Sequence, residues 1–137
     1  MANLVRFSVS LEEALLSKFD KEIKKENYPT RSKAIKDLIR ERLVKKEWVK
    51  GKAIMGAIIL VYDHHKRALA NKLTDIQHDF HDAVISSQHV HLDHDNCLEV
   101  VIVKGSSKEV EELARKLKTT KGIKYCSLNM ATTGKEI

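Results

Sequence analysis

The sequence contains little cysteine and lacks any long hydrophobic run. Two cysteines among 137 residues are too few for a disulfide framework, so we expect a reducing compartment, the cytoplasm. No stretch approaches the roughly 18 apolar residues of a membrane span, and the opening residues, MANLVRFSVSLEE, lack the apolar run of a signal peptide. With 42% hydrophobic residues, the chain can form one compact core or two small ones, with no membrane as a partner.

Basic charge and histidine occupy different parts of the chain. Residues 1–52 hold 14 Lys/Arg against 8 Asp/Glu, whereas residues 53–137 hold 11 of each, so the whole net charge of +6 lies in the first part. All seven histidines lie in the second part. This separation predicts two domains with different tasks, residues 1–50 and residues 51–137.

The basic part has the pattern of one strand and two helices. Residues 5–10, VRFSVS, alternate between apolar and polar side chains, the period of a half-buried strand. A helix is expected to begin at Ser10, where Ser10 and Glu13 form a capping-box pattern, and a second one near Thr30, with a pattern that residues 45–52 break. These elements can neither bury the apolar face of the strand nor pair its backbone, so the strand should pair with a second copy.

Two such strands would form an antiparallel ribbon, and a two-stranded ribbon fits the major groove of B-DNA. The outward face of the ribbon would carry Arg6, Ser8 and Ser10 from each chain. Arginine can bind guanine there through two hydrogen bonds. The alternative is an exposed edge strand whose polar side chains are only solvated.

The second part alternates between strand and helix patterns in the order βαββαβ. The expected strands cover residues 54–62, 83–92, 97–104 and 123–130, and the expected helices cover 65–81 and 107–119. Ser106 and Glu109 form a capping box at the start of the second helix. This order favours a ferredoxin-like sandwich with both helices on one sheet face, which makes the whole chain α+β.

Residues 89–97, HVHLDHDNC, gather three histidines and one of the two cysteines. His89 and His91 must project from the same face of their strand, and Cys97 follows directly after a four-residue turn. Three borderline or soft metal ligands therefore converge at a hairpin. If the apolar residues of the strand face the helices, the two histidines lie on the open sheet face; those apolar residues are Val84, Val90 and Leu92.

His78 is the fourth candidate ligand. On a helix it falls opposite the apolar stripe, so it points away from its own core. Since His89 and His91 are expected on the far side of the sheet, we expect His78 to complete the site of another subunit. Three imidazoles and a thiolate suit a tetragonal Ni(II) or Cu(II) ion or a tetrahedral Zn(II) ion, so ligand type leaves the metal open.

The segment VRFSVS, followed by two helices with RSKAIKDLIR, resembles the ribbon-helix-helix DNA-binding fold. Nearly the whole chain resembles the nickel-responsive regulators, which join that fold to a C-terminal ACT-like domain. The resemblance implies that the outward strand residues read bases and that the start of the second helix binds phosphate through Thr30, Arg31 and Ser32. Lys33 departs from the family pattern, in which a glutamate and the aspartate matching Asp37 can hold an accessory cation.

The resemblance also implies the metal and its ligands. In the family, the pattern H-x-H-x5-C and a histidine on the preceding helix of a neighbouring subunit bind nickel; here these are His78, His89, His91 and Cys97. One Ni(II) per chain is then expected, with Glu99 and Gln77 as hydrogen-bond partners of a ligand imidazole. Lys66 and Arg67 would contact the DNA backbone when metal is bound. The remaining candidates are expected mainly as surface or packing residues: His64, His65, His81, His94 and Cys126. The alternative for the four histidines is contact with additional metal, at His81 a second, weaker ion.

Together with these patterns, the resemblance implies a nickel-sensing transcriptional regulator, a Ni(II)-dependent repressor of nickel uptake genes. It should be a homotetramer, a dimer of dimers, that binds a palindromic double-stranded operator. No catalysed reaction is expected, because four protein ligands leave no open metal position for a hydrolase. Besides that hydrolase, the alternative is a DNA-binding regulator whose ACT-like domain senses an amino acid or another metal.

Overall fold

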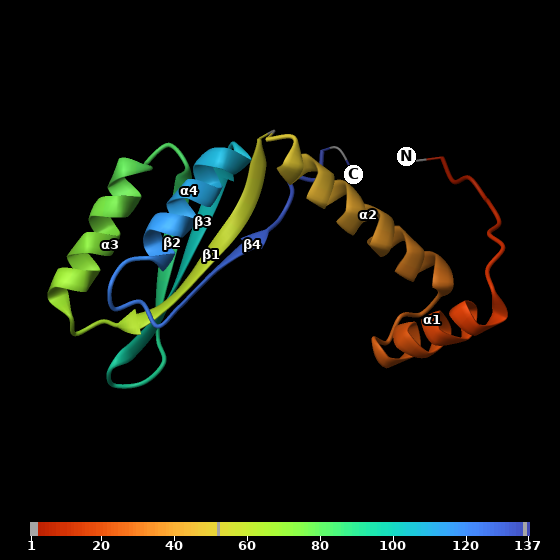
Figure 1. Cartoon of the computed structure of the whole chain (residues 1–137), viewed down its shortest axis with the longest axis horizontal. Coiled ribbons are helices and arrows are strands. Elements are labelled where there is room, and N and C mark those ends of the chain that lie inside the picture. Colours follow the sequence, from red (N-terminus) through yellow and green to blue (C-terminus); the bar gives the residue numbers. More distant parts are fainter. Residues whose placement is uncertain (1–2, 52, 136) are drawn as a thin grey trace. The chain divides into compact units, whose positions relative to one another are not determined.

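The computed structural model describes residues 3–51, 53–135 and 137, and the chain divides into two compact units, Met1–Arg40 and Glu41–Ile137. Within the described ranges, no helix is both long and apolar enough to cross a membrane. The elements follow the order α1 (Glu13–Lys25), α2 (Arg31–Val49), β1 (Ile54–Asp63), α3 (Arg67–Asp79), β2 (Val84–His91), β3 (Asn96–Gly105), α4 (Ser107–Lys118) and β4 (Tyr125–Met130) (Figure 1).

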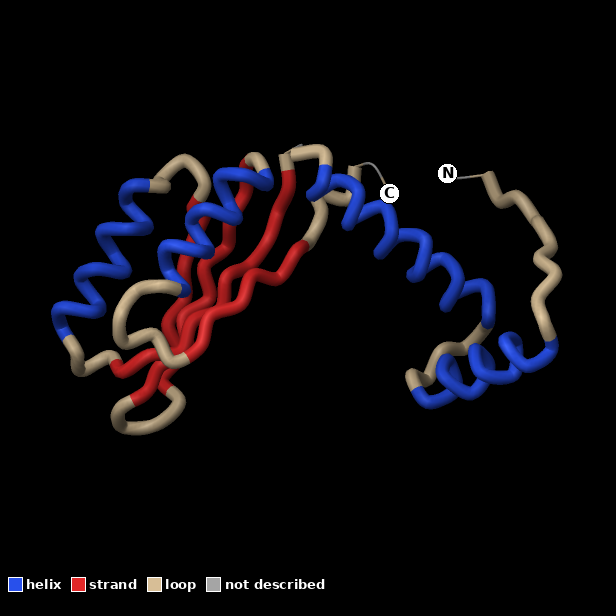
Figure 2. Tube along the Cα trace, in the orientation of Figure 1, coloured by secondary structure: helices blue, strands red, loops and turns tan. Residues whose placement is uncertain are grey.

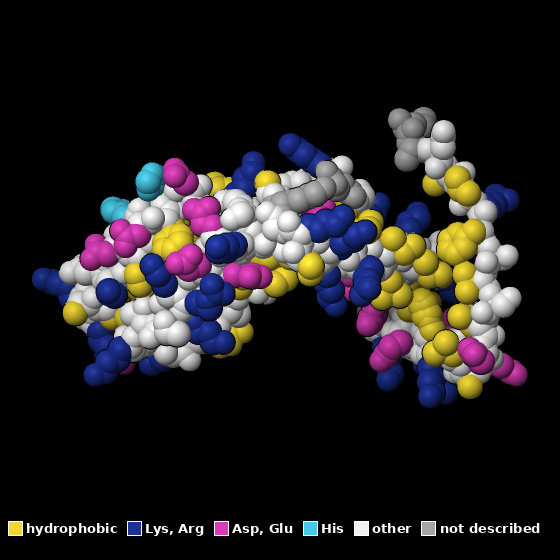
Figure 3. Space-filling view, turned by 45° about the horizontal axis from the view of Figure 1, so that its top comes forward, with side chains coloured by type: hydrophobic (Ala, Val, Ile, Leu, Met, Phe, Trp, Pro, Cys, Tyr) yellow, Lys and Arg dark blue, Asp and Glu magenta, His cyan; other side chains and the backbone are white. Residues whose placement is uncertain are grey.

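Residues 3–12 of the N-terminal unit have no regular secondary structure, so the strand predicted for residues 5–10 does not form in the single chain. A lone strand has no neighbour with which to exchange backbone hydrogen bonds. Its apolar side chains remain exposed, with 86% of Val5, 68% of Phe7 and 60% of Val9 accessible to solvent. Figure 3 shows hydrophobic side chains gathered on this unit, the surface that the predicted second copy would cover.

The predicted start is wrong for the first helix of this unit and right for the second. The N-cap of α1 is Glu12, whose backbone is extended and whose side chain makes no capping hydrogen bond, so the predicted capping box of Ser10 and Glu13 is wrong. Because the extended segment continues through Glu12, Ser10 lies too early to cap the helix. α2 starts as predicted: the Thr30 hydroxyl accepts a hydrogen bond from the backbone N–H of Lys33 at 3.1 Å.

The C-terminal unit contains an antiparallel sheet of strand order β2-β3-β1-β4, covered on one face by α3 and α4 (Figure 2). The predicted ferredoxin-like order is confirmed, and its helices and strands begin and end within two residues of the predicted bounds. The Ser106 hydroxyl caps α4 by accepting a hydrogen bond from the backbone N–H of Glu109 at 3.2 Å. The capping box predicted at this helix is therefore confirmed.

The core of this unit lies between the sheet and its two helices. Residues alternate along β1 between buried and half-buried positions, because one sheet face packs against α3 and α4 while the other is uncovered in the single chain. Buried side chains from both layers meet there, among them Ile58, Leu60, Val101, Leu73, Leu113 and Leu117. Side chains on the helix-covered face near a strand end therefore lie at the rim of the core.

The last turns of α2 pack within the C-terminal unit. The sequence predicts that residues 45–52 break the helical pattern, but α2 continues through the first part of this stretch to Val49 and buries Trp48. The indole N–H of Trp48 donates to the carbonyl of Ala131 at 2.9 Å, and this docking stabilises the final turns. Gly56 of β1 makes room for the ring: a Cβ there would lie 2.9 Å from the carbonyl oxygen of Asn129 and 3.3 Å from the Trp48 ring.

Candidate metal centre and nucleic-acid interface

A β-bulge in β2 changes which side chains face the helices. Val84 pairs with a buried residue of β3, whereas Ser86 pairs with a half-exposed residue that belongs to the opposite face. Ile85 is thus the extra residue of a bulge, and the alternation of faces is reversed beyond it. The expectation that Val84 shares a face with Val90 and Leu92 is therefore wrong; Val90 and Leu92 are exposed.

His89 and His91 consequently project from the helix-covered face, not from the open face as predicted. Across β3, His89 lies opposite Glu99 and His91 lies opposite Cys97, and both partners are buried. Directly opposite residues of antiparallel strands project to the same side of the sheet. Cys97 lies opposite Tyr62 of β1 as well, so the three strands align His91, Cys97 and Tyr62 in one row.

A buried carboxylate organises the neighbouring row. Glu99 accepts a hydrogen bond from the Tyr62 hydroxyl at 2.7 Å and another from the side-chain amide of Gln77 at 2.8 Å. The imidazole of His89 lies beside it, with Nε2 3.6 Å from a carboxylate oxygen of Glu99. Burial, reinforced by the Glu99 carboxylate, raises the pKa of Tyr62 far above its usual range, so the phenol remains a hydrogen-bond donor.

Tyr62 is the residue of this group that the sequence does not single out. It ends an apolar strand and has no motif of its own, and only the register between β1 and β3 places it opposite Cys97. The contacts of its hydroxyl with Glu99 and with His89 Nδ1, the latter at 3.5 Å, link the buried carboxylate to the candidate ligands.

Cys97 is a fully buried thiol at the rim of the core. Burial raises the pKa of the Cys97 thiol, and hydrogen bonding with Tyr62 acts in the opposite direction. A metal ion that binds this sulfur must therefore displace a proton. Cys126, in contrast, is a half-buried residue of β4 with Sγ 3.9 Å from the carbonyl oxygen of Ala114, as expected for a packed strand residue.

The donor chemistry at this end of the sheet fits a borderline metal ion. The His64 ring stacks on the His91 ring at a centroid distance of 4.6 Å. Its buried Nε2 has no hydrogen-bond partner among the residues that the structure describes, which is costly for an imidazole nitrogen unless another group binds it. The thiol of Cys97 and the imidazoles of His89 and His91 suit Ni(II) better than a hard cation such as Mg(II).

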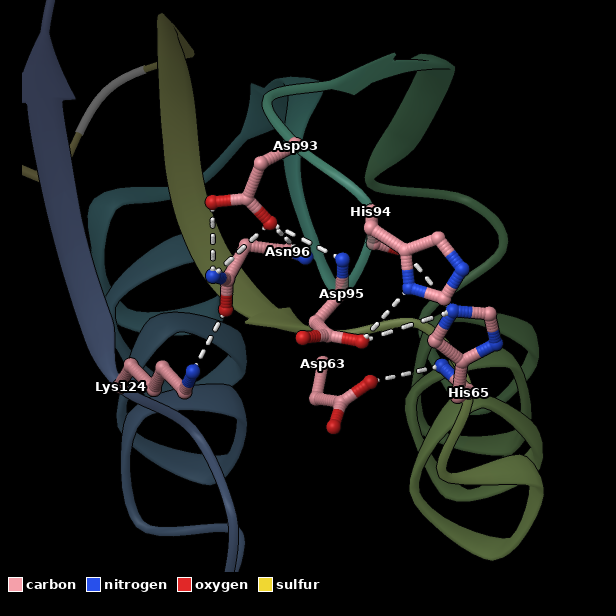
Figure 4. A network of polar contacts seen from close by, with 7 residues as sticks. All are labelled: Asp63, His65, Asp93, His94, Asp95, Asn96 and Lys124. Carbon is pink, nitrogen blue, oxygen red and sulfur yellow. Dashed lines mark hydrogen bonds and ion pairs between the residues drawn. The ribbon is translucent and has the colours of Figure 1, made fainter.

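His78 is exposed on α3 and is not gathered with the other candidate ligands in the single chain. Across residues 3–51, 53–135 and 137, one group of three or more histidine, cysteine or acidic side chains has its ligand atoms within 4.8 Å of one another: His65, His94 and Asp95 (Figure 4). The predicted set with His78 forms no such group. Because α3 covers the sheet face that carries His89 and His91, the sheet does not separate them from His78, contrary to the prediction.

The predicted DNA-binding residues of the N-terminal unit are exposed. Arg6, Ser8 and Ser10 lie in the irregular segment, and Arg31 and Ser32 lie in the first turn of α2. The Arg31 guanidinium donates to the two carboxylate oxygens of Asp20 at 2.9 and 2.7 Å, and this contact lowers the pKa of Asp20. Arg31 is therefore already paired within its own chain.

Lys33 is also paired within the chain. Its ammonium nitrogen lies 2.7 Å from one carboxylate oxygen of Asp37, and the Tyr28 hydroxyl donates to the other at 2.9 Å. The positive charge beside Asp37 is thus supplied by a side chain of the same helix. An accessory cation at this carboxylate would have to compete with that ion pair.

Lys66 and Arg67 are exposed at the start of α3, beside an open groove of about 1030 Å³. Three further lysines line this groove, Lys72, Lys116 and Lys121. The helix N-terminus and these side chains all favour an anionic ligand such as phosphate. The region predicted to touch the DNA backbone therefore carries more basic side chains than the two predicted residues.

Comparison with known proteins adds the family. The family described as NikR C terminal nickel binding domain matches residues 55–131, and the one described as ribbon-helix-helix protein, copG family, matches residues 5–46. A "Putative nickel-responsive regulator" from Syntrophus aciditrophicus (strain SB) is 53% identical over 134 residues, which cover 98% of both chains. The chain belongs to the nickel-responsive regulator family.

A second relative agrees with this assignment, and a solved structure shows the fold. A nickel-responsive regulator relative from Chlorobium limicola is 52% identical over 98% of this chain and 100% of its own. An uncharacterized protein of Thermotoga maritima with a solved structure shares the fold alone, at a TM-score of 0.54 and 10% identity, over 59% of this chain and 100% of that one. As a nickel-responsive regulator the chain is a transcriptional regulator with a nickel-binding domain, not an enzyme, and its α+β class with an N-terminal ribbon-helix-helix part is confirmed.

Proposed function

We propose that this nickel-responsive regulator is a Ni(II)-dependent repressor of nickel uptake genes. It binds one Ni(II) per chain through His89, His91 and Cys97 of one chain and His78 of a neighbouring chain. The observation that carries this proposal is the placement of His91 opposite the buried Cys97, with His89 beside Glu99. One bound Ni(II) would coordinate these side chains together, and the sheet would hold the ligands of β2 and β3 in a fixed arrangement.

The site residues act through their positions on the sheet. Glu99 orients the His89 imidazole, and Tyr62 and Gln77 in turn fix the Glu99 carboxylate. His78 is solvent-exposed on α3, where a second chain can reach it. The proposal that His78 acts in another subunit now rests on this exposure rather than on separation by the sheet.

A homotetramer, a dimer of dimers, is proposed because two apolar surfaces of the single chain are uncovered. One is the segment with Val5, Phe7 and Val9, which would pair with a second copy as the DNA-reading ribbon. The other is the open sheet face, where half-buried apolar residues line the two central strands: Ala57, Ile59, Val61, Leu98, Val100 and Ile102. Each surface needs a partner to bury it.

The proposed DNA-binding domain comprises residues 1–50 and the metal-binding and oligomerisation domain residues 51–137. Paired ribbons would place Arg6, Ser8 and Ser10 in the major groove. Thr30, Arg31 and Ser32 would bind phosphate at the N-terminus of α2, and two ribbons per tetramer would require a palindromic operator. Action on operator DNA places the protein in the cytoplasm.

The ligand assignment is tested with Cys97→Ala, using Cys126→Ala as the matched control. The first variant should lose tight Ni(II) binding and the thiolate-to-nickel charge-transfer absorption, because the thiolate is the softest and strongest donor of the set. The second should keep both. Tight binding that survives in Cys97→Ala would reject the assignment.

The sharing of the site between subunits is tested by mixing. Neither His78→Ala nor His89→Ala chains should form complete sites alone. Mixed and re-annealed tetramers should recover part of the charge-transfer absorption, because some sites then combine an intact His78 from one chain with an intact His89 from another. Complete absence of recovery would place His78 in its own chain's site or outside the site.

A further inference from the structure

The start of α2 carries a lysine where the family pattern has a cation ligand. In that pattern, a glutamate at the position of Lys33 and the aspartate matching Asp37 can hold an accessory cation. An ammonium group has three N–H donors and no lone pair to offer to a metal ion. The residues of this chain therefore do not fit the cation that the resemblance implies.

Both oxygens of the remaining ligand, Asp37, are already bound within the chain. The Lys33 Nζ lies 2.7 Å from Oδ1, and the Tyr28 hydroxyl donates to Oδ2 at 2.9 Å. These two contacts, with Lys33 the stronger, hold the pKa of Asp37 below its usual value, and the charge of Arg40 adds to them. Asp37 is therefore ionised at neutral pH, and its charge is balanced by a side chain of the same helix.

The described residues gather no set of acidic ligands around Asp37. The first turn of α2 contains no acidic residue, and within the described ranges Asp37 belongs to no group of three or more histidine, cysteine or acidic side chains. Asp20 of α1 is bound in the same way as Asp37, because both of its oxygens accept from Arg31. A hard cation needs several oxygen ligands at once, and here basic side chains already hold the carboxylates.

We propose that the Lys33 ammonium takes the place of the accessory cation, so that operator binding by this protein does not depend on which small cation the solution contains. Two carboxylates with a monovalent ion between them keep one net negative charge, whereas the pair of Lys33 and Asp37 is neutral without any ion. A negative charge here would repel DNA, because the neighbouring Thr30, Arg31 and Ser32 are proposed to bind phosphate. The inference rests on that proposed function.

The charge reversal Lys33→Glu should restore the missing ligand, and Lys36→Glu is its matched control. Both variants change the charge of α2 by the same amount, but the exposed Lys36 does not contribute to the lowered pKa of Asp37. The Thr30 hydroxyl caps α2 by accepting from the backbone N–H of residue 33, and glutamate is favourable at this position of a helix. The test variant is therefore expected to fold.

Operator affinity is measured with full-length, Ni(II)-saturated protein on DNA selected from a random pool, at one ionic strength, in potassium, sodium or tetramethylammonium chloride. The parent and Lys36→Glu should bind equally well in the three salts. Lys33→Glu should bind at least about fivefold more weakly in tetramethylammonium than in the better alkali salt, the lower end of ordinary coupling between two sites. The same dependence in the parent, or none in Lys33→Glu, would overturn the proposal.

Thermal unfolding without Ni(II) and DNA separates this inference from the proposed function. A cation that binds only the folded protein raises the Tm, so an alkali salt should raise the Tm of Lys33→Glu above its value in tetramethylammonium, and should not do so in the parent or in Lys36→Glu. If no operator can be selected, the proposed function fails while this comparison still decides the role of Lys33. If Lys33→Glu does not fold, the parent decides alone: a Tm or an operator affinity that requires the alkali ion would overturn the proposal.

Discussion

At the scale of single residues, Glu99 connects the candidate nickel ligands to the core. Its carboxylate is buried, takes hydrogen bonds from Tyr62 and Gln77, and faces the His89 imidazole. A buried carboxylate is costly unless donors surround it, and here those donors come from a strand and a helix. β3, which carries Cys97, and α3 are thus joined through the Glu99 side chain.

The substitution Glu99→Gln should weaken Ni(II) binding about 10- to 100-fold, because the amide keeps the shape of the side chain but removes the carboxylate beside His89. Chelator competition measures the affinity. The thiolate-to-nickel absorption should persist at saturating metal, since Cys97 is unchanged. Equal affinity in parent and variant would show that Glu99 supports the core but not the ligand.

The pair Lys33 and Asp37 makes a prediction about titration. The Lys33 ammonium, followed by the Tyr28 hydroxyl, holds the pKa of Asp37 below its usual value. A lowered carboxyl pKa means that ionised Asp37 stabilises the folded unit above its ordinary pKa, and that this contribution is lost as the pH falls through the lowered pKa. Lys33→Met should therefore raise the pKa of Asp37 toward the ordinary value.

An NMR titration of the Asp37 carboxyl carbon measures this shift. Lys36→Met is the control, since it removes an exposed lysine of the same helix that does not contribute to the lowered pKa of Asp37. The Asp37 midpoint should move in the first variant and stay in the second. If both variants titrate like the parent, the contact between Lys33 and Asp37 does not persist in solution.

At the scale of elements, the order of helices and strands could be predicted from local patterns, but the faces of β2 could not. Apolar alternation and the Ser106 cap are local signals, so the βαββαβ order could be predicted from the sequence. The bulge at Ile85 depends on pairing with β3, and it reverses every later side chain of the strand. The predicted open-face position of His89 and His91 was wrong for this reason, although their common face was right.

The contact between α2 and the sheet also depends on tertiary packing rather than on a local pattern. A substitution at Gly56 tests it. Gly56→Ala should lower the free energy of unfolding by about 1–3 kcal/mol, because the new methyl group meets the Asn129 carbonyl and the Trp48 ring in a filled space. Chemical denaturation followed by Trp48 fluorescence measures the loss. Unchanged stability would show that the Trp48 ring or β4 can shift at little cost.

At the scale of the whole molecule, the basic and the metal-binding residues lie in different parts of the chain, so sensing requires coupling between them. α3 carries both kinds of residue in the C-terminal unit: Lys66 and Arg67 lie at its start, and Gln77 and His78 lie near its end. In the proposed assembly, Ni(II) fixes His78 against the strands of another subunit. The same ion then fixes the basic start of the helix, which reduces the ordering cost of binding phosphate.

Metal and operator should therefore strengthen each other's binding, and a coupling of about 1–3 kcal/mol is ordinary for two such sites. We expect Lys66→Ala/Arg67→Ala to reduce this coupling while Ni(II) affinity measured without DNA is unchanged. Lys104→Ala/Lys108→Ala is the control, because it removes the same charge from exposed positions of the same unit that do not line the groove.

Operator affinity, on DNA selected from a random pool in the presence of Ni(II), is measured with and without the metal at one ionic strength, since phosphate contacts depend on salt. Equal affinity with and without Ni(II) in the parent would end the sensor interpretation. Coupling that survives in the groove variant would instead show that Lys66 and Arg67 do not carry the link between the two sites.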